Sequence, residues 1–389
     1  MYCSLLGIYI TPAGMNARER TRRQNIFPIT LGPFGSSFDD IIGALYYLSR
    51  LDYGVHLEIN GTEKFVCGFV MAFTRDMAAS QGFKGLISAI ADYGCGFCLA
   101  HKSQRVNLDF NIIKNGRYHY QTINLRRQSE MLSNKSQRLK FFQKIGMAPQ
   151  QTPLIKIAPC LDIIRSRPGD AAHSEYAGLA KQAQSLLFDA ILNKKGQEAY
   201  VKELQSQPLP PGWARLQSPM YHLKSYRMSE CARISVLTPL ILRRWLREGF
   251  IEANYLRAVR VTLTLPPIDA ITKCFALMAQ SSAVILSPSM SGEDRDQMHY
   301  IIKKGRKAFQ NLFRCASLAA ARDKRRTTTP ANSSIASSQA SSVLDIEEDD
   351  DGEKVKRSKK EKVFKTFLSR LNVHTGLHYW EVAHKYITP

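Results

Sequence analysis

The sequence has few acidic residues for its length. It contains 33 Asp and Glu against 54 Lys and Arg, which gives a formal net charge of +21 at pH 7. A charge of this sign attracts polyanions, and such binding weakens as salt is added. Nucleic acid is the partner that this composition favours, and the alternative is a charge that only keeps the protein in solution.

Long hydrophobic runs and several catalytic motifs are also missing. No apolar run approaches the roughly 18 residues needed to cross a bilayer, so we predict no membrane span. The chain has no glycine-rich phosphate loop, no Gly-x-Ser-x-Gly elbow and no His-Glu-x-x-His helix, which argues against several common enzyme classes. The eight cysteines are scattered and no segment resembles a cleavable leader, so we expect reduced thiols in an intracellular protein.

The first stretch that stands out is residues 65–73, which is almost entirely apolar and rich in β-branched and aromatic residues. Such a run predicts a strand that is covered on both faces. It is followed by Asp76. A carboxylate at the end of a central strand is a common position for a catalytic or metal-binding group in α/β folds, and the alternative is a cap on the next helix.

Apolar periodicity and turn signals place the other elements. The dipeptide Asn60-Gly61 predicts a two-residue hairpin turn. Apolar residues at three- and four-residue spacing predict helices. These helices cover residues 38–51, 81–91, 129–145, 175–204, 239–249 and 296–320.

The composition changes after residue 326. Residues 327–342 are rich in Thr, Ser and Ala, and we predict that they are disordered because they cannot bury enough apolar surface. An acidic run at 345–353 and a basic run at 354–362 follow. The basic run is a candidate nuclear-import signal, and the alternative is a solvated charge run.

Two constellations could carry chemistry. Cys95-x-x-Cys98 has the spacing of half a zinc site, which His101 or His119 could complete, and the alternative is a buried pair of reduced thiols. Asp170 and His173, three residues apart at the start of a helix, could reach a shared site, and the alternative for Asp170 is a plain N-cap. Basic residues on two predicted helices are candidate DNA contacts: Arg243, Arg244, Arg247, Lys303, Lys304, Arg306 and Lys307.

The order of several segments resembles the middle of fungal CACTA-like (En/Spm, Plavaka-type) DNA transposases. Each segment is weakly specific, and their shared order carries the resemblance. They are NIFPITLGPFG (25–35), LDYG (51–54), RDM (75–77), GCGFC (94–98), RPGDAAHSEY (167–176), WARLQSP (213–219) and NVHTGLHY (372–379).

The resemblance implies a ribonuclease-H-like core whose three acidic residues hold two Mg²⁺ or Mn²⁺ ions and cut DNA. It makes Asp76 the second of these acids, and it matches Asp170 and His173 to an Asp-x-x-His signature near the entry to a helical insertion at about 186–320. The implied partner is DNA at transposon ends, and self-association stays open. The chain departs from the family in three ways. Segments for the first and third acids are not found, and Glu381 lies near the position of the third acid without matching it. Ala78 also stands where the family has proline.

We therefore predict a mixed α/β fold with an incomplete ribonuclease-H-like core, a large α-helical insertion and a disordered charged linker. The predicted parts are a core at 1–175, the insertion at 176–322, the linker at 323–363 and a helical segment returning to the core at 364–389. The predicted function is that of a nuclear, transposon-derived DNA-binding protein that does not cut DNA as a lone chain. The alternatives are a non-catalytic nuclear module that binds DNA or protein and is stabilised by Zn²⁺, and the product of a fragmentary gene.

Overall fold

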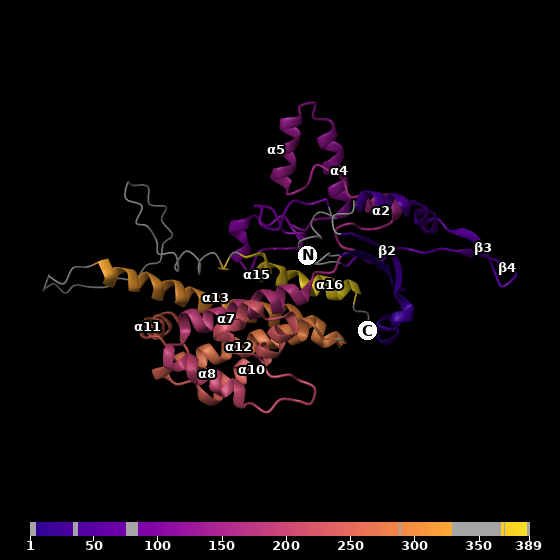
Figure 1. Ribbon diagram of the computed structural model, residues 1–389. Helices are drawn as coiled ribbons and strands as arrows, with labels where there is room; N and C mark the ends of the chain where they lie inside the picture. Colours follow the sequence, from indigo (N-terminus) through magenta and orange to yellow (C-terminus); the bar gives the residue numbers. More distant parts are fainter. Residues whose placement is uncertain are drawn as a thin grey trace. The chain divides into compact units, whose positions relative to one another are not determined.

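The computed structural model describes residues 5–33, 38–74, 85–287, 289–328, 367–368 and 370–386. The described chain is mostly helical and carries two small two-stranded sheets, so the protein is of mixed α/β type (Figure 1). It divides into two compact units. Unit 1 comprises Met1–Gln104 and Asp109–Asp170, and unit 2 comprises Arg105–Leu108 and Ala171–Pro389.

The two sheets of unit 1 are antiparallel pairs. Strand β1 (Leu5–Ile10) pairs with β2 (Phe27–Pro33), and β3 (Val55–Ile59) pairs with β4 (Thr62–Val66). The predicted turn joins β3 to β4, with positive φ angles of 54° at Asn60 and 73° at Gly61, which the primed hairpin turns require. Short helices lie beside these strands: α1 (Ala17–Arg20), η1 (Arg23–Asn25), α2 (Phe38–Ala44) and η2 (Tyr46–Asp52).

The prediction of a buried strand over residues 65–73 is wrong. Strand β4 ends at Val66, and residues 67–74 have no regular secondary structure. Among the described residues β4 pairs with β3 alone, and Phe65 and Phe69 are 59% and 63% exposed, so this stretch is not covered on both faces. Asp76 lies outside the described residues, and the ribonuclease-H-like core stays a prediction.

The rest of unit 1 contains a helical hairpin and a short helix. Most of the predicted helix at 129–145 is α5 (Lys135–Ile145), and only its first two residues belong to the preceding helix, α4 (His119–Glu130). Helix α5 begins at Lys135 because the Asn134 side chain caps it by accepting from the Ser136 and Gln137 amides. The part of the predicted 81–91 helix that is described, residues 85–91, is not helical. Residues from the hairpin and its flanks form one buried cluster: Leu86, Phe142, Met147, Ile163 and Ile164. The remaining elements are α6 (Leu154–Ile157) and η3 (Lys102–Val106), of which the last two residues are assigned to unit 2.

All the regular elements described in unit 2 are helices, joined by loops, and its longest helices pack side by side (Figure 1). The predicted helix at 296–320 is confirmed as part of α13, whose apolar stripe includes the buried residues Ile302, Phe309 and Phe313. The elements are η4 (Ala172–Ala180), α7 (Lys181–Leu186), η5 (Leu187–Ile191), α8 (Lys194–Ser206), α9 (Pro219–His222), η6 (Leu223–Ser225), α10 (Met228–Trp245), η7 (Glu248–Phe250), α11 (Ala253–Thr262), α12 (Pro267–Ile285), α13 (Gly292–Thr328), α15 (Leu371–Thr375), η8 (Gly376–His378) and α16 (Tyr379–Tyr386).

Helix α12 is, among the described residues, the one helix long and apolar enough by composition to cross a membrane. Its buried side chains, among them Ile271 and Phe275, pack inside unit 2, where α12 contacts α10 and α13. The core helix of a soluble protein meets the same criterion, so α12 is only a weak indication of a membrane span.

The predicted charged linker at 323–363 is described only at its start, where residues 323–328 form the end of α13, so the predicted boundary at 323 is wrong. Residues 329–366, which include the acidic and the basic run, lie outside the described ranges. The predictions of disorder and of a nuclear-import signal there stay predictions.

Candidate metal centre

The segment that carries Cys95 and Cys98 is fastened to residues 115–117. The Leu99 amide donates to the Asn115 carbonyl at 2.8 Å, and the Arg117 amide donates to the Phe97 carbonyl at 2.8 Å. Cys98 also forms an isolated β-bridge with Gly116. These bonds hold the Cys98 end of the Cys-x-x-Cys loop.

The side chain of Arg117 adds three further bonds to this loop. Its guanidinium donates to the carbonyls of Tyr93 (2.8 Å), Cys95 (2.9 Å) and Ile145 (2.7 Å), and the residue is buried. Burial lowers the pKa of Arg117, while the neighbouring Cys95 and Cys98 raise it. The guanidinium therefore places a positive charge beside the two thiols and would favour their ionised form.

Without a metal ion the thiol of Cys98 stays protonated. A hydrogen bond with Cys95, followed by burial, raises the pKa of Cys98 far above its ordinary value, and Arg117 opposes this shift only in part. A bound cation would reverse the balance, because a coordinating thiol loses its proton.

His374 and His378 form a second pair of buried side chains. They lie four residues apart on α15 and η8, so one helical face presents both rings, with centroids 5.2 Å apart. The Nδ1 atom of His378 lies 3.1 Å from Oε2 of Glu381. A carboxylate on one ring nitrogen orients the ring and directs the other nitrogen, Nε2, to a metal ion.

The four residues together form a buried Cys2His2 group. One ligand atom each from Cys95, Cys98, His374 and His378 lies within 4.8 Å of the others. Two sulfur and two nitrogen donors are a ligand set that zinc takes in tetrahedral structural sites. The second half of the site is not His101 or His119, as the sequence suggested: His101 Nδ1 instead lies 2.8 Å from Ser103 Oγ.

The histidine pair was missed because it lies far from the cysteines in the sequence. The available signal was the His-x-x-x-His spacing within the segment at 372–379, which places two imidazoles on one face of a helix. Spacing alone could not connect that pair to Cys95 and Cys98.

The helix that carries the histidines is held by contacts within unit 2. Arg306 and Glu175 form an ion pair with only 1% of each side chain exposed. The guanidinium of Arg306 lies against Gly376, where an added Cβ would sit 2.6 Å from Nη2, so the backbone between the two histidines approaches the arginine closely. The hydroxyl groups of Ser174 and Tyr379 also share a hydrogen bond.

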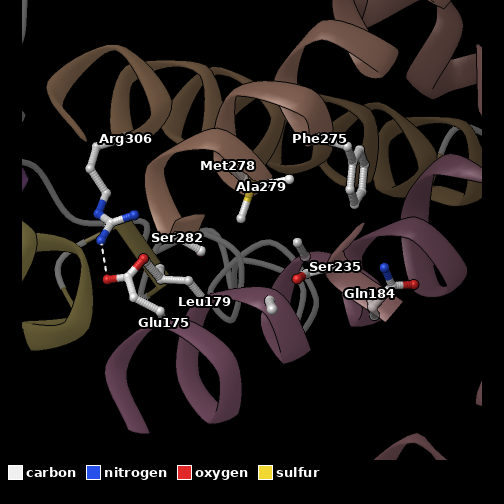
Figure 2. Close-up of a pocket in the computed structure, with 11 residues that line it drawn as sticks. Glu175, Leu179, Gln184, Ser235, Phe275, Met278, Ala279, Ser282 and Arg306 are labelled. Carbon is white, nitrogen blue, oxygen red and sulfur yellow. Dashed lines mark hydrogen bonds and ion pairs between the residues drawn. The ribbon is translucent and has the colours of Figure 1, made fainter. Parts of the chain in front are cut away.

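Figure 2 shows the Glu175–Arg306 pair at one end of a narrow cavity. Leu179 lies beside the pair, and Met278 and Phe275 of α12 lie farther along the wall. The cavity has room for about one water molecule, which is too little for a substrate.

The prediction of Arg306 as a DNA contact is wrong, because its side chain is buried. Arg306 falls four residues after Ile302 and three before Phe309, on the buried stripe of α13, and Glu175 neutralises its charge. The other candidate DNA contacts keep access to solvent. Lys303 is half-buried, whereas these five are exposed: Arg243, Arg244, Arg247, Lys304 and Lys307.

The predicted catalytic group is described only in part. His173 lies in the first turn of η4, and Asp170 precedes that element by two residues. Asp76 lies outside the described residues, so the meeting of the three side chains stays a prediction.

Comparison with known proteins gives no relative: no family model matches the chain, and no curated protein matches it significantly.

Proposed function

We propose that the protein is a zinc-stabilised DNA-binding module that resembles the catalytic region of CACTA-like transposases and does not cut DNA by itself. The observation that carries the zinc assignment is the buried Cys2His2 group, with ligand atoms within 4.8 Å of one another. Sulfur and imidazole ligands select zinc over Mg²⁺ and Mn²⁺, which prefer oxygen. Either of those ions would need a separate carboxylate site, for which Asp76 and Asp170 are the candidates.

The proposed zinc ion has a structural role. The four side chains would fill all four tetrahedral positions, so no position would remain for a reacting water or substrate. Two thiolates offset the charge of Zn²⁺, which allows a fully buried site. Because unfolded chains lack a preformed site, the binding free energy contributes directly to folding.

The proposal of DNA as partner rests on charge and on the resemblance. The chain has a net charge of +21, and the exposed basic residues named above lie on α10 and α13 of unit 2 or, for Arg247, two residues after α10. Phosphate contacts from such residues supply affinity that depends little on sequence and strongly on salt. Within the mixed α/β class, the resemblance favours a ribonuclease-H-like core.

The zinc assignment is tested by elemental analysis of protein purified without chelators. We expect about one zinc per chain, loss of zinc in the double variant Cys95→Ala/Cys98→Ala, and a lower unfolding temperature on chelation. The matched control is Cys231→Ala/Cys274→Ala, which removes two other buried thiols and should retain zinc. Stoichiometric zinc in the first variant, or none in the wild type after growth with zinc, would refute the assignment.

The DNA assignment is tested by fluorescence anisotropy with a labelled random-sequence duplex. We expect binding that weakens steeply with salt. A nicking assay with Mg²⁺ or Mn²⁺ should show no turnover. Turnover that Asp76→Ala abolishes would contradict the non-catalytic part of the proposal.

A further inference from the structure

We infer that the helical hairpin formed by α4 and α5 is a duplex-DNA-binding arm. This inference rests on the proposed function and assigns it a surface in unit 1 that differs from the candidate contacts on α10 and α13. Figure 1 shows α4 and α5 side by side, joined by a short loop.

The hairpin is strongly basic. Between His119 and Ile145 the chain has six Lys and Arg residues and one acidic residue, Glu130. Two of the six are structural. Arg126 is buried and donates to the carbonyls of Gly85, Ala148, Pro149 and Gln150. Arg138 donates to the carbonyl of Leu132, in the loop after α4.

The other four basic side chains are exposed: Arg127, Lys135, Lys140 and Lys144. Within the described ranges, no ion pair involves any of these four. Lys140 and Lys144 lie one turn apart on the same face of α5, about 6 Å along the helix axis. Four cations without acidic partners form a surface that a polyanion complements.

The remaining exposed side chains of the hairpin are mostly those that donate hydrogen bonds to phosphates and bases. They are Gln121, Asn124, Gln128, Ser133, Asn134, Ser136, Gln137 and Gln143. The exposed Tyr120 adds a phenol to this surface. Two large aliphatic side chains, Met131 and Leu139, are exposed among these eight polar ones, so a protein partner that needs a broad apolar contact fits the surface less well than a nucleic acid.

The arm is rigid at its base, which keeps its charges in a fixed arrangement. Arg126 connects α4 to the backbone on both flanks, and Phe142 of α5 packs in the cluster with Leu86 and Met147. A helix that is held in this way loses little conformational freedom on binding. Helices of this diameter enter the major groove of duplex DNA.

The test compares two variants with equal loss of charge, in the full-length protein with its zinc. The first is Lys135→Gln/Lys140→Gln/Lys144→Gln, in the hairpin. The control is Lys194→Gln/Lys195→Gln/Lys202→Gln, three exposed lysines of α8. Both are measured by anisotropy with the random-sequence DNA duplex between roughly 50 and 200 mM salt.

We expect the hairpin variant to bind DNA at least roughly tenfold more weakly than the wild type. The slope of the logarithm of its binding constant against the logarithm of the salt concentration should be smaller in magnitude by about two to three, because each phosphate contact contributes about 0.9 to that slope. The control should change much less. The substitution of the same three hairpin lysines by arginine, which keeps the charge, should preserve binding and shows that the fold tolerates changes there.

Three outcomes would overturn the inference. Equal weakening of both variants would show a diffuse charge effect. Unchanged binding by the hairpin variant would place the DNA elsewhere while the proposed function stands. A hairpin-dependent preference for duplex RNA would identify a different partner. If the wild type does not bind duplex DNA, the proposed function itself fails.

Discussion

Arg306 and Glu175 form an ion pair inside unit 2, with 1% of each side chain exposed. The guanidinium lies against Gly376, between the two histidines of the metal centre. The pair therefore connects α13 to η4 and supports the backbone that presents His374 and His378.

Replacement of Arg306 should destabilise the fold strongly. Arg306→Met leaves the Glu175 carboxylate buried without its partner, which costs about 3–5 kcal/mol of unfolding free energy. The measurement is urea unfolding at neutral pH. Lys307→Met, an exposed neighbour on the same helix, should stay within about 0.5 kcal/mol of the wild type. A small effect of Arg306→Met would show that the buried pair contributes little.

A methyl group at position 376 should also destabilise the protein. Gly376→Ala places a Cβ 2.6 Å from Arg306 Nη2, and the ion pair prevents the arginine from moving away freely, so we expect a loss of about 1–3 kcal/mol. In the background of Arg306→Met the same change should cost less, because the clash is gone. Additive effects in this double-mutant cycle would contradict the contact.

Removal of the Glu381 carboxylate should weaken zinc binding without abolishing it. Glu381→Ala takes away the group 3.1 Å from His378 Nδ1 that orients the ring, and such changes reduce metal affinity about 10- to 100-fold. Competition with a chromophoric chelator measures this effect. The control is Glu198→Ala, an exposed carboxylate of α8, which should leave the affinity unchanged.

Stability should fall in alkaline solution because of buried thiols. Burial raises the pKa of Cys315 from 9.0 to about 11. Between these values the unfolded chain releases a proton that the folded chain keeps, so the contribution of Cys315 is complete below pH 9 and is lost as the pH rises through 11. Its loss amounts to about 1.4 kcal/mol per pH unit.

Urea unfolding from pH 8 to 10.5 tests this expectation. Cys315→Ala should reduce the slope of the unfolding free energy against pH by the equivalent of about one proton. Cys67→Ala, at an exposed position, should leave this slope unchanged. An equal slope in the wild type and Cys315→Ala would show that the thiol ionises alike in both states.

Local patterns in the sequence determined several elements correctly. The Asn60-Gly61 turn and the apolar stripe of α13 depend on neighbours within a few residues, so sequence spacing was enough to predict them. The break between α4 and α5 was missed, although Asn134, which caps α5, is visible in the sequence. Arg306 was predicted to contact DNA because it is charged, but it occupies a buried position of the stripe. Its burial is tolerable because Glu175, from another element, forms an ion pair with it.

The sequence by itself determined the Cys-x-x-Cys half-site, the basic composition and the helical character of unit 2. Only the tertiary structure decided that residues 65–73 are not a covered strand, because coverage depends on whether other elements pack there. It also decided which histidines join Cys95 and Cys98, since the ligands of a metal site come from segments far apart in the chain, and the fold alone brings them within bonding reach.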